Sequence, residues 1–269
     1  MNLSMKGRVI AITGASAGIG RATALRMARE GWAIAACARR ADRLDTLAGE
    51  IGAAGGQALT IVADVTGEGE MANFVERTTA RFGRLDVMMC NAGFGIYGAI
   101  DRISADQMRK LMDINYFGTF YAARAGLAVF RRQGRGHIVI VSSIVGKRGV
   151  PYMGAYSATK FAQIGMAECL RSEVAGSDIH VSVVCPVSTT SDFKEVMIRE
   201  TGSDISQSNG PVQSVEKVAD AVARAIEHPI PEVYPYFKSR GLVLLNALAP
   251  GFTDRFVQKF GRKPVQRAG

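Results

Sequence analysis

The sequence predicts a single α/β domain built on a doubly wound parallel sheet with helices on both faces. Six short apolar runs alternate with segments of helical periodicity along the chain. The runs are apolar nearly throughout instead of alternating with polar residues, as expected for strands that are covered on both faces. Strand, helix and strand repeated in this order are typical of a parallel sheet.

The elements follow one another without a Pro/Gly/Ser-rich linker before residue 200, which favours one domain in a chain of 269 residues. The strands are expected at 8–13, 33–38, 58–63, 85–90, 137–142 and 180–185. Helical spacing is clear in two sets of residues: Leu44, Leu47 and Ile51, and Met71, Phe74, Val75 and Thr78. Residues 186–213 read as a loop with one short helix, and a loop of this length is usually a lid or a binding element.

The composition is that of an ordinary soluble globular protein, with 48% hydrophobic and 21% charged residues. The amino terminus runs from a short polar start into the first strand, so no signal peptide is expected. The four cysteines lie far apart and mostly in strand-like runs, which predicts buried reduced thiols and a cytoplasmic location. The three histidines are scattered, which predicts no metal site.

The net charge of +9 is unevenly distributed. Residues 236–269 carry seven basic side chains and one acidic side chain, so this segment holds +6 and the rest of the chain is close to neutral. A nucleic-acid footprint over the whole surface would need positive charge throughout. We therefore expect no nucleic-acid partner, and we interpret 236–269 as a basic, partly apolar C-terminal extension of the same domain.

A glycine-rich turn, "TGASAGIG", follows the first strand and opens the first helix. Gly14, Gly18 and Gly20 leave room for a tight turn and for close approach of the backbone to a phosphate, while the helix start offers free N–H groups and the positive end of its dipole. The spacing differs from G-x-G-x-x-G, and a plain strand–helix turn is the alternative. Its place in a βαβ unit favours a dinucleotide site in a Rossmann-like sheet, with Ser16 and Ile19 in the binding loop.

The end of the second strand indicates which nicotinamide cofactor is bound. An acid there would hydrogen-bond the ribose 2′-hydroxyl of NAD, whereas an arginine suits the 2′-phosphate of NADP. The sequence is "CARRADRL", with Arg39 and Arg40 and no acid before Asp42. A guanidinium holds a phosphate through charge-assisted hydrogen bonds. We therefore predict NADP(H) as the cofactor, and the alternative is that both arginines form a solvated helix start.

Six pieces of the chain resemble the short-chain dehydrogenase/reductase family, in its single-domain, NADP-preferring branch. They occur in the family's order: "TGASAGIG", "ADV", "NAGFG", "MDINYFGT", "VSS" and "YSATK". Ser143 precedes Tyr156 by thirteen residues, the separation that the family uses. The resemblance implies that residues 1–235 form a Rossmann-fold dinucleotide-binding and catalytic domain.

The resemblance also implies a role for each matching residue. Tyr156 would be the catalytic acid/base, and Lys160 would bind the nicotinamide ribose and perturb the tyrosine. Ser143 would hold the substrate carbonyl, and Asn115 would support a water-mediated proton path to the lysine. The other implied cofactor contacts are Asp64 and Val65 at the adenine, Asn91, Ala92 and Gly93 along the cofactor, and Pro186 with Thr189 after the sixth strand.

The chain departs from the family's pattern after the sixth strand. The family has Pro-Gly there and a threonine five positions past the proline, whereas this chain reads "CPVSTTS". Val187 replaces the glycine and Ser191 takes the place of the threonine. Thr189 and Thr190 are the candidates to substitute for it, and the approach of the backbone to the nicotinamide is expected to differ.

The spacing of Tyr156 and Lys160 suits proton transfer. Hydride transfer to a ketone leaves negative charge on oxygen, so a proton donor must lie beside it. A free phenol has a pKa of about 10, and an ammonium one helical turn away, together with the positive charge of oxidised nicotinamide, favours the phenolate and lowers that pKa. Ser143, at the carboxyl end of the fifth strand, lies where ligands bind in open parallel sheets. Taken alone, Tyr156 could equally be a half-buried aromatic of a helix.

The substrate is expected to be a small molecule with a carbonyl or secondary alcohol, bound at Ser143 and Tyr156. Nine mostly apolar residues are candidates for the lining of its pocket: Phe94, Ile96, Tyr97, Val145, Val150, Met153, Phe193, Val196 and Met197. They favour a lipid, a steroid or an acyl chain, and the alternative is that they belong to the core.

The C-terminal extension allows three interpretations. Its apolar run at 242–249 is too short to span a bilayer, and Phe252, Phe256 and Phe260 recur at four-residue spacing beside basic residues. Such a segment is able to lie on an anionic membrane surface, to pack on a second subunit, or to cover the substrate cleft. The resemblance implies a homodimer or homotetramer through the long helices near 104–133 and 152–175.

These observations predict an oxidoreductase that transfers a hydride between NADP(H) and a carbonyl or secondary alcohol, with Tyr156 as general acid/base. An epimerase or dehydratase would need a separate substrate domain, which 269 residues hardly provide. A catalytically silent NADP(H)-binding sensor or scaffold is the alternative from another class, and the presence of Ser143, Tyr156 and Lys160 disfavours it. A polyanion-binding role for the extension is a further alternative.

Overall fold

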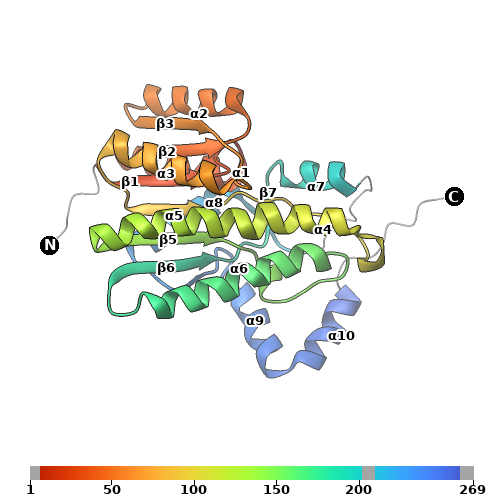
Figure 1. Ribbon diagram of the computed structural model, residues 1–269. Coiled ribbons are helices and arrows are strands. Elements are labelled where there is room, and N and C mark those ends of the chain that lie inside the picture. Colours follow the sequence, from red (N-terminus) through yellow and green to blue (C-terminus); the bar gives the residue numbers. More distant parts are fainter. Residues whose placement is uncertain (1–6, 202–209, 261–269) are drawn as a thin grey trace.

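The computed structural model describes residues 7–201 and 210–260, which form an α/β domain around one parallel sheet (Figure 1). In the described residues the sheet has seven strands in the order β3-β2-β1-β4-β5-β6-β9. Its strands are β1 (Val9–Thr13), β2 (Ala33–Ala38), β3 (Gln57–Val62), β4 (Val87–Cys90), β5 (Arg135–Val141), β6 (Asp178–Val184) and β9 (Glu232–Val233). The order reverses between β1 and β4, and such a switch point is where open parallel sheets bind ligands, beyond the carboxyl ends of the strands.

The six strands predicted from apolar runs are confirmed to within one or two residues at each end. The central strands β1, β2 and β4 are buried at every position, as expected for strands covered on both faces. The prediction missed β9, because a strand of two residues is too short to show a pattern.

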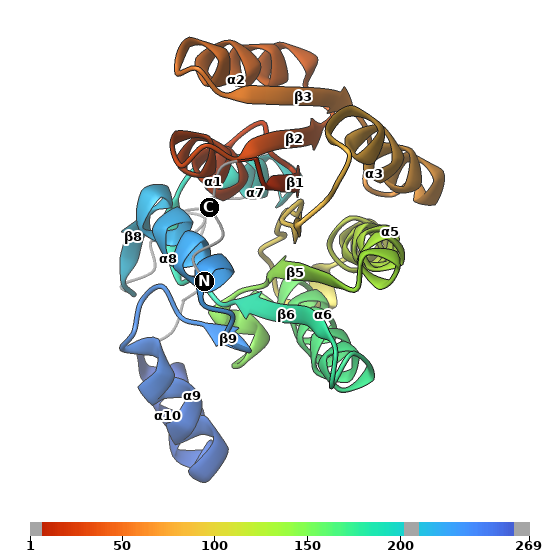
Figure 2. The same ribbon diagram turned by 90° about the vertical axis from the view of Figure 1, so that its left-hand side faces the viewer.

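Helices cover both faces of the sheet, as predicted (Figure 2). One face packs against α1 (Gly18–Arg29), α2 (Ala41–Ala53) and α8 (Val215–Glu227), and the other against α3 (Glu68–Phe82), α5 (Gly118–Gln133) and α6 (Gly154–Glu173). Both sets of residues with predicted helical spacing lie on buried faces, in α2 and α3.

The segment predicted as a long loop contains more structure than expected. Strand β7 (Ser188–Thr190) pairs with β8 (Val212–Ser214), and the helix α7 (Phe193–Thr201) lies between them. The loops on the same side hold η1 (Ile100–Arg102), α4 (Ala105–Leu111), the π-helical turn η2 (Met112–Phe117) and η3 (Ile144–Gly146).

The C-terminal extension forms two helices, α9 (Ser239–Leu248) and α10 (Pro250–Phe260), which project from the domain as a hairpin (Figures 1 and 2). Arg148 ties the hairpin to the body, because its guanidinium donates hydrogen bonds to Asn246 and Asp254. The side chains of Phe256 and Phe260 and the basic residues after 260 lie outside the described residues. Among the described helices, none is long and apolar enough to cross a membrane.

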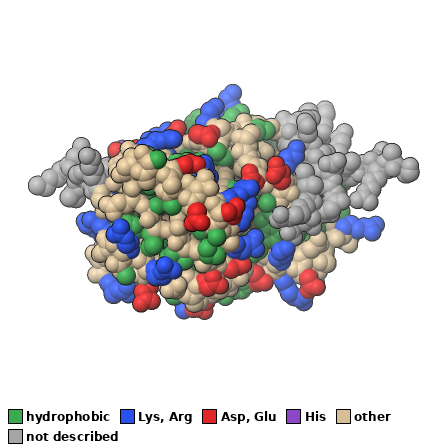
Figure 3. All heavy atoms as spheres, turned by 90° about the horizontal axis from the view of Figure 1, so that it is seen from above, with side chains coloured by type: hydrophobic (Ala, Val, Ile, Leu, Met, Phe, Trp, Pro, Cys, Tyr) green, Lys and Arg blue, Asp and Glu red, His purple; other side chains and the backbone are tan. Residues whose placement is uncertain are grey.

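The surface carries mixed charge on one face (Figure 3), and three of the four cysteines are buried. On the face seen from above, Lys and Arg side chains are mixed with Asp and Glu, as is typical of a solvent-exposed surface (Figure 3). Cys37, Cys90 and Cys185 are buried free thiols, as predicted. Cys169 is exposed, contrary to the prediction, because it lies on the outer face of α6 and not in a strand.

Candidate active site

The glycine-rich turn lies at the switch point, between the end of β1 and the start of α1. Gly14 and Gly18 have positive φ angles of +67° and +57°, which side chains rarely adopt. A Cβ on Gly14 would lie 2.8 Å from Cα of Ala92, and one on Gly20 would lie 2.5 Å from Nδ2 of Asn91. The glycines are therefore required by close packing of this turn, which keeps the backbone free to approach a ligand. Ile19, next to Gly20, is half-buried at the start of α1.

Asn91 holds this turn in place. Its side-chain Nδ2 donates to the carbonyls of Thr13, at 2.9 Å, and Gly14, at 3.2 Å. The hydroxyl of Thr13 accepts from the backbone N–H groups of Asn91 and Ala92. The ends of β1 and β4 are thus locked together at the point where the turn must be rigid.

The residues predicted at the adenosine end of the cofactor do not all face the same way. Arg40 Nη2 donates to the hydroxyl of Ser16, in the glycine-rich turn, over 2.9 Å. Arg39 is two-thirds exposed and lies 3.9 Å from the carboxylate of Asp64. Val65 is buried against Gly118 of α5, where a Cβ would lie 2.7 Å from Val65 Cγ2. Of the two predicted arginines, Arg40 is therefore the one beside the turn.

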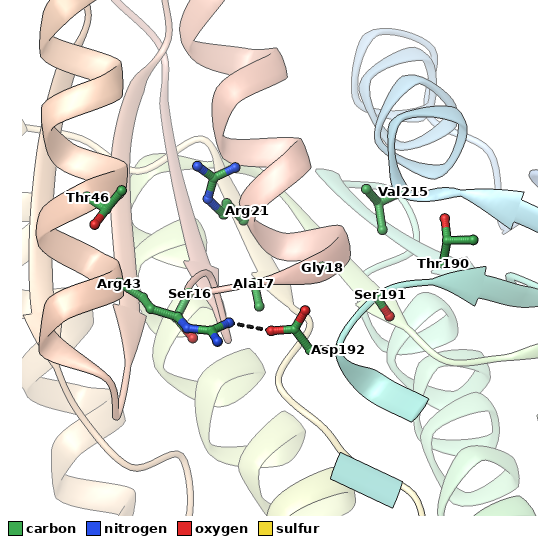
Figure 4. Close-up of a pocket in the computed structure, with 10 residues that line it drawn as sticks. All are labelled: Ser16, Ala17, Gly18, Arg21, Arg43, Thr46, Thr190, Ser191, Asp192 and Val215. Atoms are coloured by element: carbon green, nitrogen blue, oxygen red, sulfur yellow. Dashed lines mark hydrogen bonds and ion pairs between the residues drawn. The ribbon is translucent and has the colours of Figure 1, made fainter. Parts of the chain in front are cut away.

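A hollow of about 380 Å³ opens beside the glycine-rich turn (Figure 4). Its lining comes from the glycine-rich turn, α1, α2, the segment after β6 and the start of α8: Ser16, Ala17, Gly18, Arg21, Arg43, Thr46, Thr190, Ser191, Asp192 and Val215. Ser191 lies against Gly18, where a Cβ would be 3.4 Å from Ser191 Cβ. Thr189 was predicted to contact the cofactor, but its hydroxyl donates to the carbonyl of Val187. Thr190 and Ser191 line the hollow and Thr189 does not, so the contact of Thr189 with the cofactor stays a prediction.

Tyr156 and Lys160 lie on one face of α6, and Ser143 lies at the end of β5 next to them. Tyr156 is 7% exposed, and Ser143 hydrogen-bonds its phenol. The ammonium nitrogen of Lys160 is 5.5 Å from the centroid of the Tyr156 ring. Ser142 is engaged elsewhere, since its hydroxyl donates to the carbonyl of Lys160. The carbonyl of Pro186 accepts a bond from Ser143 at 3.4 Å, so the predicted residues after β6 reach this site.

Gln163, which the sequence analysis did not single out, joins Lys160 to Asn115. Its Oε1 accepts from Lys160 Nζ at 3.1 Å, and its Nε2 donates to the Asn115 carbonyl at 2.7 Å and the Thr119 hydroxyl at 2.8 Å. This fully buried amide links the lysine to Asn115 directly, and the water-mediated proton path that the resemblance implied stays a prediction. The sequence does contain a pattern that indicates this role for Gln163, because residues 156, 160 and 163 recur at helical spacing on one buried face of α6.

Asn115 itself stabilises the loop that follows β4. Its side chain exchanges two hydrogen bonds with the backbone of Phe94, at 3.0 and 2.9 Å, and donates to Thr159. A Cβ on Gly93 would lie 3.0 Å from Asn115 Oδ1 and 3.7 Å from Lys160 Nζ. Because Gly93 has no side chain, the side chains of Asn115 and Lys160 can both pack against its backbone.

The comparisons with known proteins agree with this arrangement. The model of a family described as short chain dehydrogenase matches residues 8–202. The chain belongs to the short-chain dehydrogenase family. The Bacillus subtilis protein named "uncharacterized oxidoreductase YxnA" is similar to it, with 31% identity over 258 residues that cover 95% of this chain and 72% of that protein.

Two solved structures of the family are also similar to this chain. An alcohol dehydrogenase from Thermococcus sibiricus, in complex with 5-hydroxy-NADP, is 28% identical, with a TM-score of 0.76 over 84% of this chain and 95% of that one. A short chain dehydrogenase from Mycobacterium paratuberculosis, bound to NAD, is 28% identical, with a TM-score of 0.76 over 86% and 97%. This family membership makes the chain an oxidoreductase that acts on CH–OH or C=O groups with a nicotinamide cofactor.

The residues present fit such a cofactor. The glycine-rich turn forms a cradle that a Cβ at Gly14 or Gly20 would fill, at the start of a helix whose first N–H groups are available to a phosphate. Arg40 adds positive charge at one end, and Lys160 lies at the other, beside Tyr156. In this family member, the candidate site thus extends along the carboxyl ends of β2, β1, β4 and β5.

Burial changes the ionisation of both side chains on α6. It raises the pKa of Tyr156 above its ordinary value, and the hydrogen bond from Ser143 offsets only part of that rise. Burial also lowers the pKa of Lys160 to about 7. In this structure burial has the larger effect and raises the pKa of the phenol, while the predicted lowering by Lys160 together with oxidised nicotinamide stays a prediction for the cofactor complex.

The nine apolar residues predicted to line a substrate pocket all belong to one cluster around Tyr156. Helix α7 packs against this cluster through Phe193, Val196 and Met197. The ring of Phe193 lies 5.6 Å from that of Tyr156, and a Cβ on Gly95 would lie 3.0 Å from Phe193 Cζ. The segment predicted as a lid or binding element thus lies directly over the tyrosine.

Proposed function

We propose that the chain is an NADP(H)-dependent carbonyl reductase or alcohol dehydrogenase, with Tyr156 as general acid/base and an apolar substrate. The observation that carries this proposal is the meeting of Ser143, Tyr156 and Lys160 at the switch point of the sheet, inside an apolar cluster. In the family, the chemistry supplied by a bound nicotinamide cofactor is transfer of a hydride.

Side chains of the site supply the proton that the substrate oxygen takes up during reduction. In the reducing direction, the Ser143 hydroxyl and the Tyr156 phenol both donate hydrogen bonds to the substrate oxygen, and the phenol then gives up its proton to the alkoxide. A raised pKa keeps Tyr156 protonated and ready to donate. The ammonium of Lys160, held by Gln163 and the carbonyl of Val141, lies where it stabilises the resulting phenolate.

The apolar surroundings support a hydrophobic substrate. Tyr156 packs in one cluster with aliphatic and aromatic side chains, including Phe94, Val145, Met153 and Phe193. Burial of apolar substrate surface stabilises a complex by about 25 cal/mol per Å². A lipid, a steroid or an acyl chain with a carbonyl or secondary alcohol would use this cluster fully.

The NADP(H) preference rests on Arg40. We expect Arg40→Ala to raise the Kd for NADPH about 10- to 150-fold, because one charge-assisted hydrogen bond contributes about 1.5–3 kcal/mol, while the Kd for NADH changes little. Calorimetric titration with both cofactors measures this. Arg39→Ala is the matched control and should leave both values near wild type, since Arg39 points to Asp64. Equal affinity of the wild type for NADPH and NADH would overturn the preference.

Catalysis distinguishes this function from a silent NADP(H)-binding sensor or scaffold. A panel of carbonyls and alcohols, followed by NADPH absorbance, should reveal turnover that depends on Tyr156. Tight cofactor binding without turnover of any panel member would favour the sensor.

We also propose a homo-oligomer, supported by exposed aromatic side chains, and a cytoplasmic location, supported by buried thiols. Phe117 and Phe161 are 40% and 45% exposed on the long helical segments that the family resemblance implicates in a homodimer or homotetramer. Burial of two such rings against a second copy would remove apolar surface from water, which supports a homo-oligomer. Three buried thiols support a reducing, cytoplasmic setting.

Peripheral membrane contact is proposed for the tip of the C-terminal hairpin. Leu244, Leu248 and Phe252 are 61%, 77% and 59% exposed there, in the most basic part of the sequence. Apolar side chains beside positive charge match the chemistry of an anionic lipid surface.

A vesicle experiment tests the membrane contact. We expect the protein to co-sediment with phosphatidylglycerol-containing vesicles but not with pure phosphatidylcholine, and Leu248→Asp to abolish most of that binding. Val62→Asp is the matched control, because Val62 is similarly exposed, at 61%, and lies on β3, at the opposite edge of the sheet from β9 and the hairpin (Figure 2). A Leu248→Asp variant that sediments like the wild type, or a loss of dimers instead, would contradict the proposal.

A further inference from the structure

Asp192 joins two parts of the molecule that lie far apart in the sequence. It lies between β7 and α7, and its carboxylate accepts a hydrogen bond from the guanidinium of Arg43 on α2 (Figure 4). Nη1 of Arg40 lies 3.9 Å from the same carboxylate. The segment after β6 is therefore tied by charge to the start of α2.

The two arginines surround the place where the cofactor's 2′-phosphate is expected. Arg40 donates to Ser16 of the glycine-rich turn, and Arg43 lines the hollow beside that turn. Among the described residues that line the hollow, Asp192 is the one with an acidic side chain. A phosphate and Asp192 would thus compete for the same guanidinium groups, since both bind them by charge-assisted hydrogen bonds.

The segment that carries Asp192 also covers Tyr156. The next residue, Phe193, packs on the Tyr156 ring, and Met197 is buried in the same cluster. A displacement of Asp192 would therefore move the residue next to it, Phe193, whose ring packs on the ring of Tyr156.

We propose that Asp192 is an internal counter-ion for Arg40 and Arg43, which the 2′-phosphate of NADP(H) displaces, so that NADPH but not NADH loosens the segment over Tyr156. This inference rests on the NADP(H) preference proposed above. It deepens that preference, because the two cofactors would differ in their effect on the catalytic cluster as well as in affinity.

The strength of the ion pair suits such a role. The side chains of Arg43 and Asp192 are 44% and 40% exposed, and ion pairs at this exposure contribute little to stability. The hydrogen bond from Arg43 holds the pKa of Asp192 below its usual value, so the carboxylate is charged at neutral pH. Asp192 can therefore reduce the affinity for a phosphate without preventing its binding.

Calorimetric titration of the full chain with NADPH and with NADH tests the inference without a substrate. We expect Asp192→Asn to lower the Kd for NADPH about 2- to 5-fold, the range of an exposed ion pair, and to leave the Kd for NADH unchanged. Asp220→Asn is the matched control. It removes a comparably exposed pair with Arg26, at 2.9 Å, away from the hollow.

Hydrogen exchange supplies the second readout. In the wild type, NADPH should raise the amide exchange of residues 191–197 relative to NADH, and Asp192→Asn should show the raised exchange with either cofactor. An NADPH-preferring protein whose NADPH affinity and exchange are unaffected by Asp192→Asn would overturn the counter-ion. A wild type without NADPH preference would instead overturn the proposed cofactor, so the two failures are distinguishable.

Discussion

Replacing Tyr156 by phenylalanine is expected to lower turnover by about 10²–10⁴-fold, the usual effect of losing a general acid. The change removes one oxygen atom from a buried ring that already packs against Phe193, so the fold should be preserved. The alkoxide left by hydride transfer would then have no proton donor beside it except the Ser143 hydroxyl. Initial rates of NADPH oxidation with an active carbonyl measure the loss.

The control for this variant makes the same chemical change elsewhere. Tyr121→Phe on α5 removes a phenol whose ring contacts Phe117 and Phe120, and turnover should stay near wild type. The affinity of Tyr156→Phe for NADPH should also change little, because the loss is chemical. Near-normal turnover of Tyr156→Phe would remove the tyrosine from the mechanism.

Replacing Gln163 by leucine is expected to lower both stability and turnover. Leucine fills a similar volume but leaves the Lys160 ammonium without one acceptor and the Asn115 carbonyl and Thr119 hydroxyl without one donor. Each of these groups keeps one other partner, so the cost is that of the lost hydrogen bonds, two of about 0.5–1.5 kcal/mol and one to the ammonium of about 1.5–3 kcal/mol, and the free energy of unfolding should fall by about 2.5–6 kcal/mol. Urea unfolding measures that fall, and turnover should fall with it because Lys160 loses its position.

Gln133 provides the matched control, since its amide also bridges two segments. Its Nε2 donates to the Leu85 carbonyl and its Oε1 accepts from the Leu85 N–H, far from Tyr156. Gln133→Leu should cost stability and leave turnover per folded molecule unchanged. A Gln163→Leu protein with wild-type turnover would show that the amide bridge only supports the fold.

The fold was largely predictable because its signal is local. Apolar runs and helical spacing are read within single segments, and they predicted six of the seven strands of the large sheet in the described residues and the buried faces of α2 and α3. Ser143, Tyr156 and Lys160 were equally accessible, because their residue types and spacing carry the family resemblance.

The remaining features depend on contacts across the chain. Asp192 and Arg43 are 149 residues apart, and no local pattern indicates that they pair. Arg39 and Arg40 are neighbours with the same chemistry, and only the fold turns one toward Ser16 and the other toward Asp64. The depth at which Tyr156 is buried, which raises its pKa in this structure, is a tertiary property that the spacing of residues does not show.

Transfer of deuterium from labelled NADPH into a carbonyl substrate tests the central claim most directly. The wild type is expected to place deuterium on the carbinol carbon of an apolar alcohol product. Tyr156→Phe, with NADPH bound at an unchanged Kd, should do so at least about 100 times more slowly. Transfer by Tyr156→Phe at the wild-type rate, or tight NADPH binding by the wild type with no transfer to any carbonyl of the panel, would contradict it.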